Sequence, residues 1–230
     1  MTDSADTATQ GDDTDSDFVA ATRVFYDAIA EDYFDRFRSG LANQPLERAV
    51  LAAYAEFVRG SGGGSGQVAD LGCGPGWVTG FLDSLGLSVF GLDVSAAMLA
   101  VARREHPGLR FQQGSMLELD LADSTLAGVV SWYSTIHTPA DQLPALFAEF
   151  RRVLAPGGHL LLGFQAGDVH KHHDQPFGRP VSMTFQRRRP ERIAELLTEA
   201  GFTLASQTVR AADEEAGESS PHAFLMARRP

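Results

Sequence analysis

The chain is poor in cysteine: Cys73 is the only one, so no intrachain disulfide can form and an oxidising compartment is not indicated. Long apolar runs are missing too, since HLLLGF at residues 159–164 is far too short to span a bilayer and is typical of a buried strand. The N-terminus is acidic and polar, whereas a secretory signal would be basic and then apolar. These absences predict a cytoplasmic protein without a membrane partner.

Positive charge is also scarce. The formal net charge is −11, and residues 1–17 contain six aspartates but neither lysine nor arginine. Such a segment cannot bury enough apolar surface to fold, so it is expected to be a disordered acidic tail. The rest of the chain has no broad attraction for phosphate backbones or anionic lipid, which excludes nucleic acid and membranes as expected partners. The basic run at residues 187–189 is interpreted as a solvated approach to a helix.

What the chain does have is a length of 230 residues and a hydrophobic fraction of 43%, enough for one globular domain with a small addition. Residues 18–60 show helical spacing, with Tyr26, Tyr33 and Phe37 on one face, and this predicts two N-terminal helices. Residues 61–66, SGGGSG, are predicted to form a flexible joint, because glycine loses much backbone freedom when it is ordered.

From residue 67 onward, short apolar runs alternate with helical patterns, which is typical of βα units in a mostly parallel sheet. Ser95 is predicted to cap the helix after the second strand, and Pro107 to end it. Residues 117–123 are ambiguous, and APGG at 155–158 is predicted to be a turn. The segments predicted to be strands are residues 68–71, 88–94, 109–115, 126–134, 159–164, 202–209 and 222–228.

One motif in this region carries chemistry. VADLGCGPG at residues 68–76 joins a strand to a helix, and its glycines let a ligand approach the backbone amides. A dinucleotide fingerprint would need a further glycine at position 77, which is Trp77. Asp70 precedes the glycines. A carboxylate at this position would repel a diphosphate, whereas it would attract a cationic ligand. Asp93 ends the next strand and can accept both hydroxyls of a ribose.

This motif, together with GLDVSAAML at residues 91–99, QQGSMLEL at 112–119 and FRRVLAPGGHLLL at 150–162, resembles the class I SAM-dependent methyltransferase family, in its small-molecule type 11/25-like branch. The resemblance implies an α/β fold with a Rossmann-like, seven-stranded, mostly parallel sheet whose last strand is antiparallel. It implies N-terminal lid helices in residues 18–60 and a SAM-binding domain in residues 67–230. The cofactor, S-adenosyl-L-methionine (SAM), would lie at the carboxyl ends of the first, second and fourth strands.

The resemblance also implies roles for individual residues. Asp70, Gly72 and Gly74 match positions that wrap the methionine half of SAM, and Asp93 matches the ribose-binding position. Tyr33 matches a lid tyrosine over the methionine end, with simple packing as the alternative. The remaining cofactor-binding candidates are Cys73 as a small filler of the glycine loop, Val94 and Met98 beside adenine and ribose, Ser115 and Met116 at the adenine edge, and Trp132.

Methyl transfer from SAM is an in-line displacement that mainly needs alignment and exclusion of water, so few catalytic groups are required. His137, which follows the fourth predicted strand, is the candidate general base for an acceptor hydroxyl or amine. The alternative is a histidine that only orients this loop. Tyr133 is likewise either a pocket residue or part of the core.

Three histidines, at positions 170, 172 and 173, lie close together after the fifth predicted strand. They could bind a metal, but a structural site needs a further ligand, and a substrate-facing segment without metal is the favoured interpretation. The residues expected to shape the acceptor pocket are Phe177, Arg179 and Phe185.

The sequence therefore predicts a SAM-dependent methyltransferase that acts on an oxygen or nitrogen of a small molecule, with secondary metabolites as one class of acceptor. The first alternative is an NAD(P)-dependent oxidoreductase, which Trp77 and the position of Asp70 weaken. The second is a protein that binds SAM without catalysis. A monomer and a homodimer are both left open.

Overall fold

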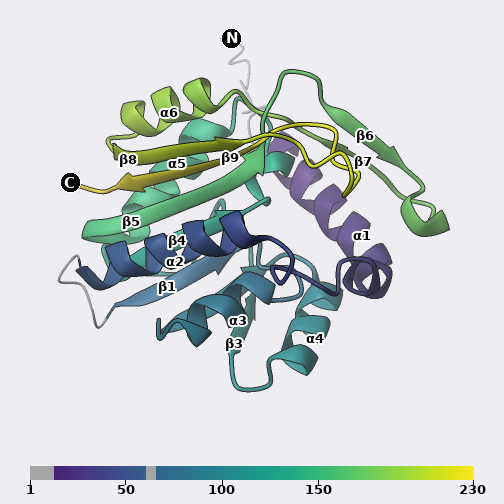
Figure 1. Ribbon diagram of the computed structural model, residues 1–230, viewed down its shortest axis with the longest axis horizontal. Helices are drawn as coiled ribbons and strands as arrows, with labels where there is room; N and C mark the ends of the chain where they lie inside the picture. The colour runs from purple at the N-terminus through teal and green to yellow at the C-terminus, as the bar shows by residue number, and fades with distance from the viewer. Residues whose placement is uncertain (1–12, 61–65) are drawn as a thin grey trace, which may run out of the picture.

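The computed structural model of the protein describes residues 13–60 and 66–230, and its centre is a seven-stranded sheet (Figure 1). The strands, in spatial order, are β3 (Arg110–Gln113), β2 (Val89–Asp93), β1 (Gln67–Leu71), β4 (Leu126–Trp132), β5 (Leu154–Gln165), β9 (His222–Arg228) and β8 (Thr203–Arg210). Strands β1 to β5 run parallel, whereas β9 is antiparallel to both of its neighbours. The predicted sheet, with its last strand antiparallel, is confirmed.

Parallel pairing brings the ends of three strands to one edge of this sheet. In the β1–β2 register Asp70 lies opposite Gly91, and in the β1–β4 register it lies opposite Val130. Because the strands share a direction, the segments that follow Leu71, Asp93 and Trp132 all leave from the same carboxyl edge. Ligands of open α/β sheets bind at this edge.

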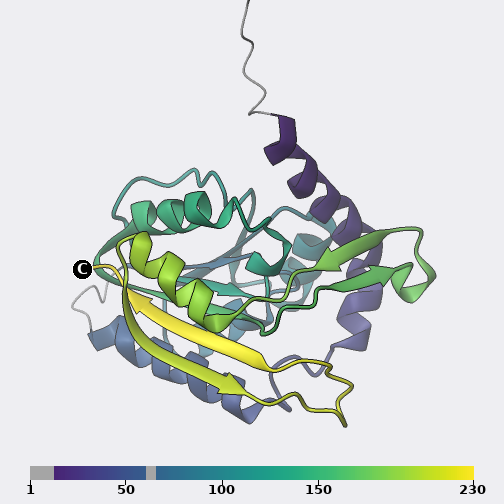
Figure 2. The same ribbon diagram turned by 90° about the horizontal axis from the view of Figure 1, so that it is seen from above.

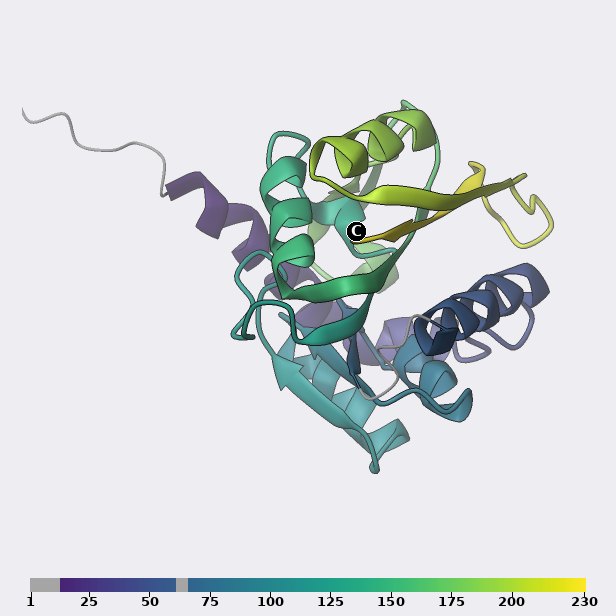
Figure 3. The ribbon, with the colours of Figure 1, turned by 90° about the vertical axis from the view of Figure 1, so that its left-hand side faces the viewer.

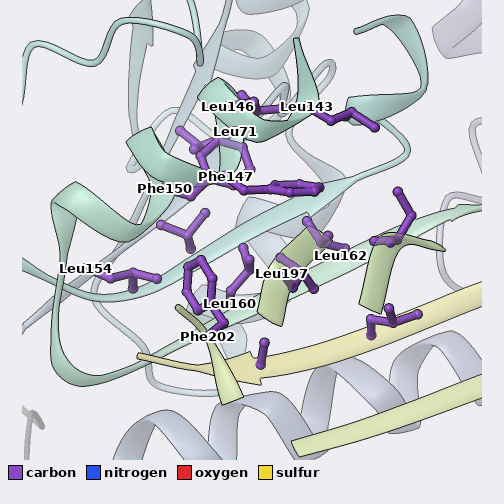
Figure 4. Close-up of a cluster of buried hydrophobic side chains, with 14 of the residues drawn as sticks. Leu71, Leu143, Leu146, Phe147, Phe150, Leu154, Leu160, Leu162, Leu197 and Phe202 are labelled. Carbon is purple, nitrogen blue, oxygen red and sulfur yellow. The ribbon is translucent and has the colours of Figure 1, made fainter. Parts of the chain in front are cut away.

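Helices cover both faces of the sheet, as the end-on view in Figure 3 shows. Helices α5 (Leu143–Val153) and α6 (Pro190–Glu199) pack on one face. Their cluster of buried side chains, with Phe147 and Phe150 against Leu160 of β5, is drawn in Figure 4. Burial of apolar surface of this kind, at about 25 cal/mol per Å², is the main force that holds the layers together.

Helices α2 (Pro45–Gly60) and α3 (Trp77–Ser84) pack on the opposite face. The fully buried Tyr54 of α2 reaches β4 at Gly128, where a Cβ atom would stand only 2.1 Å from the tyrosine hydroxyl. Gly128 is therefore required by packing. Although the whole of residues 18–60 is expected to act as a lid, α2 belongs to the layer that covers the sheet.

Helix α4 (Ala96–Glu105) begins as the sequence predicts. The backbone N–H of Met98 donates to Ser95 Oγ over 3.0 Å, which is a helix N-cap, and the helix ends before Pro107. Helix α1 (Asp13–Arg36) docks on this end, because Asp27 accepts hydrogen bonds from Ser95 Oγ at 2.6 Å and from the N–H of Ala97 at 3.1 Å. Asp27 thus fixes α1 beside the carboxyl edge of the sheet.

A hairpin after β5 is the main element that the sequence patterns do not predict. Strands β6 (Lys171–Asp174) and β7 (Ser182–Phe185) pair antiparallel, and Figure 2 shows them beside α1. Two short 3₁₀ turns are η1 (Thr135–His137) and η2 (Pro176–Gly178). Residues 155–158, predicted to be a turn, are instead part of β5, because a shift of register lets Leu154 pair with Leu126.

Several expectations concern segments at the margin of the described residues. The tail predicted for residues 1–17 lies outside them up to residue 12, and α1 begins at Asp13. The joint predicted for residues 61–66 also lies outside them, except for Gly66. Among the helices that the structure describes, none combines the length and the hydropathy needed to cross a membrane.

Candidate active site

A cavity of about 560 Å³ opens at the carboxyl edge of the sheet, between α1, the β6–β7 hairpin and the loop before β9. This volume is within the range of small-molecule binding sites. The predicted cofactor-binding and catalytic residues, except Asp70, line it: Tyr33, Gly72, Cys73, Gly74, Asp93, Val94, Met98, Ser115, Met116, Trp132 and His137. Segments far apart in the sequence therefore converge on one site.

The glycine loop presents its open side to this cavity. Gly74 has a φ of +52°, and a Cβ atom built on it would meet no described atom within 4 Å. A ligand can approach the backbone there without obstruction. Gly72 has a φ of +74°, but its Cβ would stand 2.3 Å from Cβ of Ser134, so packing against the β4 loop also demands glycine.

Asp93 lies at the end of β2, and its carboxylate shapes the loop. Oδ2 accepts a hydrogen bond from the N–H of Gly74 at 2.8 Å, and Oδ1 accepts one from the N–H of Ser95 at 2.9 Å. Burial raises the pKa of Asp93, while these backbone hydrogen bonds act in the opposite direction. Each carboxylate oxygen has a further lone pair, so Asp93 can also accept hydrogen bonds from hydroxyls in the cavity.

Asp70 lies beneath the loop and not on the cavity wall. It is 1% exposed, and Thr79 of α3 donates its hydroxyl to Oδ2 over 2.6 Å. Oδ1 has no hydrogen-bond partner among the described residues. Burial raises the pKa of Asp70 to about 7, although the Thr79 bond lowers it. Asp70 therefore bonds to α3 and is not among the residues that line the cavity.

The N-terminal helix closes the cavity with aromatic side chains. Tyr33 stacks on Trp77 with ring centroids 5.9 Å apart, and it meets Tyr26 edge to face at 6.0 Å. Burial raises the pKa of Tyr33 to about 12, and the nearby charge of Asp93 contributes to the same shift. Trp77, at the position where a dinucleotide fingerprint has glycine, thus packs against Tyr33 and supports this part of the lid.

His137 projects into the cavity from η1, just after β4. Its Nε2 is 2.8 Å from the Tyr26 hydroxyl, and its ring meets Phe185 edge to face at 4.9 Å. Nδ1 has no hydrogen-bond partner within the described part of the chain. Burial lowers the pKa of His137 to about 3, so the imidazole is neutral near pH 7. The sequence did not show that Tyr26 would hold it.

A second tyrosine–histidine pair lies at the other wall. Tyr133, in the left-handed region at φ +55°, places its hydroxyl 2.5 Å from Nδ1 of His222. Arg210 binds Glu47 of α2 at 2.6 Å and Glu218 at 2.5 Å beside this pair. Sequence reasoning missed His222, Arg210 and Glu218, because their partners are distant in the chain and no local motif marks them.

The histidines after β5 do not converge. His172 contacts Thr184 through Nδ1 at 3.0 Å, while His173, on the other face of β6, packs on Phe185 at 4.6 Å. In residues 13–60 and 66–230, no group of three or more His, Cys, Asp or Glu side chains is arranged to hold a metal. Of the three residues expected to shape the acceptor pocket, Phe177 and Phe185 line the cavity, whereas Arg179 binds Asp32 of α1 at 2.7 Å.

Comparisons with known proteins agree with this geometry. Residues 68–158 match a family model described as a methyltransferase domain. A malonyl-[acyl-carrier protein] O-methyltransferase of Pectobacterium atrosepticum is 40% identical over 93 residues, which are 40% of this chain and 36% of that protein. An uncharacterized methyltransferase of Synechocystis is 30% identical over 148 residues, covering 60% of this chain and 67% of that one.

A solved structure shares the fold over most of its length. It is the 1,6-didemethyltoxoflavin-N1-methyltransferase of Burkholderia thailandensis with bound 1,6-didemethyltoxoflavin and S-adenosylhomocysteine, at 18% identity and a TM-score of 0.68, covering 98% of this chain and 92% of that chain. The chain spans only 36 to 44% of the length of the malonyl-[acyl-carrier protein] methyltransferases that it matches. The family model, the relatives and the sheet order together show that the chain belongs to the class I SAM-dependent methyltransferases.

Proposed function

We propose that this chain binds SAM in the cavity and transfers the methyl group to an oxygen or nitrogen of a small molecule. The observation that carries the proposal is the meeting of the open Gly74 backbone and the Asp93 carboxylate at one cavity on the carboxyl edge. Support comes from the Burkholderia thailandensis enzyme of the same fold, which holds S-adenosylhomocysteine (SAH).

Different residues of the cavity would bind different parts of SAM. The backbone around Gly72 and Gly74 would hold the methionine half of SAM, and Asp93 would bind the ribose hydroxyls. Val94, Met98, Ser115 and Met116 would border the adenosine, and Trp132 the reacting end. When bound, SAM supplies a methyl group that its sulfonium has already activated.

The protein then has to align and desolvate the acceptor. Tyr33 and the other aromatic side chains of α1 close the cavity and exclude water. Alignment of two reactants can lower a barrier by roughly 7 to 11 kcal/mol, so it can account for most of the rate. No strong acid or base is required.

His137 is proposed to bond the acceptor through Nδ1, which is buried and has no hydrogen-bond partner among the described residues. A base works best when its pKa is near the working pH, and the pKa of about 3 makes His137 a weak base. Neutral imidazole is, however, a good hydrogen-bond partner, and Tyr26 fixes the orientation of the ring. We therefore assign to His137 the positioning of the acceptor, with proton transfer limited to acceptors that are already acidic.

The two other functions considered for this sequence are less well supported. Trp77 fills the position of a fingerprint glycine and supports Tyr33, which leaves the oxidoreductase without its diphosphate turn. A non-catalytic SAM-binding protein would need no acceptor space beyond the cofactor. We propose a monomer or homodimer acting in the cytoplasm on a dissolved acceptor, since the net charge of −11 does not favour nucleic acid or anionic membranes.

The test is product formation from SAM. The protein is incubated with SAM and a panel of small phenols, carboxylic acids and amines, and mass spectrometry detects methylated product and SAH together. We expect both products with at least one acceptor class, a loss of at least tenfold in Asp93→Asn, and no loss in the exposed control Asp83→Asn. SAM binding without product from any acceptor would contradict catalysis, and absence of SAM binding would contradict the whole proposal.

A further inference from the structure

The cavity has two ends with different chemistry. Apart from Tyr33 of α1 and Trp132 at the end of β4, the candidates for cofactor binding come from β2, α4 and the segments after β1, β2 and β3, on one half of the sheet. The other half is formed by the segments after β4 and β5 and by the loop before β9. Strands β2 and β5 are separated by β1 and β4, which at about 4.8 Å per strand places them roughly 14 Å apart. The second end is therefore free for the acceptor.

The β6–β7 hairpin forms one wall of this second end. Its register pairs Lys171 with Phe185, and side chains alternate between the two faces of a strand. Lys171, His173 and Phe185 accordingly line the cavity. On the opposite face His172 and Thr184 bond to each other, outside the cavity lining. The hairpin thus presents an aromatic ring beside a cation to the acceptor space.

Two cations at this end have no counter-ion. The side chain of Lys171 forms no ion pair or hydrogen bond within the described residues, and the guanidinium of Arg187 bonds only the hydroxyl of Ser219, at 2.7 Å. Among the nearby arginines, Arg179 pairs with Asp32 and Arg189 with Asp168, while the buried Arg188 bonds the carbonyl of Thr138. The chain has 30 acidic and only 19 basic residues, so carboxylate partners are not scarce. Other arginines without a carboxylate, such as Arg103 and Arg229, bond backbone carbonyls, whereas Lys171 and Arg187 face the cavity with donors that an anion can bind.

The acidic side chains that face the cavity do not cancel these cations. Asp93 lies at the cofactor end, where two backbone N–H groups bind its carboxylate. Glu218 is held by both outer nitrogens of Arg210, at 2.5 and 2.7 Å, and by the N–H of Asp213 at 2.7 Å. The charged side chains lining the cavity are Arg36, Asp93, Lys171, Arg187 and Glu218.

We propose that the methyl acceptor is an aromatic carboxylate, with its ring packed on Phe185 and its carboxylate bound by Lys171 and Arg187. Lys171 is exposed and Arg187 half-buried, so the carboxylate lies at the mouth of the cavity and the ring lies inside. Within residues 187–189, Arg187 then binds the carboxylate and Arg189 is exposed. The interpretation of this run as solvated is wrong for Arg188, which is buried and bonds the carbonyl of Thr138. This inference rests on the proposed function, because it names the substrate class of the same site.

The test compares each carboxylate with its uncharged amide. Benzoate, 2-naphthoate and indole-3-carboxylate, and their carboxamides, are titrated by calorimetry into the protein saturated with SAH. We expect at least one carboxylate to bind ten times or more tighter than its amide, since hydrogen bonds to charged groups are the stronger ones. The preference should fall to threefold or less in the double variant Lys171→Met/Arg187→Met.

A matched control removes the same charge outside the cavity. The double variant Arg189→Met/Arg192→Met lies in the same region, where both arginines are exposed and paired with carboxylates. It should keep the full preference, as should His172→Gln on the outer face of the hairpin. Binding of none of the carboxylates, equal binding of acids and amides, or equal effects of the two double variants would overturn the inference. Failure of SAH to bind would instead count against the proposed function, and the acid–amide comparison can still be made on the free protein.

Discussion

Asp70 of β1 and Asp93 of β2 are two buried carboxylates near the glycine loop, and their surroundings differ. Asp93 receives two backbone N–H groups, whereas Asp70 receives one hydroxyl and keeps Oδ1 without a partner in the described structure. Burial without compensation disfavours the charged form of Asp70, and this raises its pKa. Asp93 can therefore accept hydrogen bonds from a ligand, whereas the buried Asp70 lowers the free energy of unfolding when its carboxylate is charged.

The first prediction concerns the effect of Asp70 on stability. The pKa of Asp70 is about 7 in the fold against 3.8 when unfolded, so the folded state keeps a proton that the unfolded state has lost. Stability should fall as pH rises from about 4 to 7 and then stay low, by a few kcal/mol in total. Urea unfolding of Asp70→Asn at pH 5 and pH 8 should show a much smaller difference than the wild type. An unchanged difference would show that Asp70 is not the group that titrates.

The second prediction concerns the charge of His137. Its pKa of about 3 lies below the unfolded value of 6.5, so between these values the unfolded state binds a proton that the fold does not. Stability from this residue is present above pH 6.5 and is lost as pH falls toward 3. In NMR the His137 ring should show no protonation between pH 8 and pH 5. A titration midpoint near 6.5 would contradict the burial of this ring.

The third prediction concerns the lid tyrosine. Tyr33→Phe keeps the ring that stacks on Trp77 but removes a hydroxyl that lies close to Asp93 in the cavity. We expect the dissociation constant for SAM to rise about two- to tenfold, the effect of one hydrogen bond, with the free energy of unfolding unchanged. Calorimetry measures the first quantity and urea unfolding the second. An unchanged dissociation constant would leave Tyr33 with packing alone.

At the scale of elements, α1 is held over the cavity by an apolar cluster, in which Phe34 packs with Met98 and Val101 of α4, and by a few polar contacts. Asp27 binds the first turn of α4, and Glu31 binds Arg104 of the same helix with both oxygens, at 2.7 and 3.1 Å. The Glu31 pair is exposed and contributes little to stability. Asp27 is therefore the main polar contact between the lid and the cofactor end.

The fourth prediction follows from this contact. Asp27→Ala leaves Ser95 and Ala97 without their acceptor and should cost about 1 kcal/mol, as the loss of a helix cap does. The lid should open more often, so SAM should dissociate faster while the sheet stays intact. Hydrogen exchange should rise in α1 and not in β1 or β4. Glu31→Ala serves as the control and should leave both quantities close to the wild type.

The elements that could be predicted from the sequence are those with an apolar pattern. Strands β1, β2, β4 and β9 are buried runs, and their boundaries agree with the predictions to within two residues. The hairpin at β6 could not be predicted, because KHHD has neither alternation nor apolar residues. Its stability comes from pairing with β7 and contact with α1, which are tertiary effects.

The site residues that belong to local sequence motifs could be predicted, whereas contacts between residues far apart in the sequence could not. The loop at Gly72 to Gly74 and Asp93 could be assigned because glycine spacing and strand ends are local signals. The contacts Tyr26–His137 and Tyr133–His222 join residues 111 and 89 positions apart, and no local pattern encodes them. For Asp70 the motif predicts the position in the chain but not the side-chain contact, which is a hydrogen bond to Thr79 outside the cavity lining.

At the scale of the whole molecule, the sheet order brings side chains from β1, β2, β4, β5 and the β6–β7 hairpin, or from the loops that follow these strands, to one cavity. The cofactor end is built on β1 and β2, the acceptor end on β4, β5 and the hairpin, and α1 closes over both. Although the net charge is −11, the acceptor end carries unpaired Lys171 and Arg187. These two cations therefore favour an anion at this end of the cavity although the chain as a whole is negatively charged.

Binding of an adenosyl cofactor in this cavity is best tested by calorimetric titration of the protein with SAM, SAH and NADP⁺ under one set of conditions. We expect micromolar binding of SAM and SAH, no heat from NADP⁺, and at least tenfold weaker binding of SAH to Asp93→Asn than to Asp83→Asn. A folded protein that gives no heat with SAM or SAH, or that binds NADP⁺ instead, would contradict this expectation.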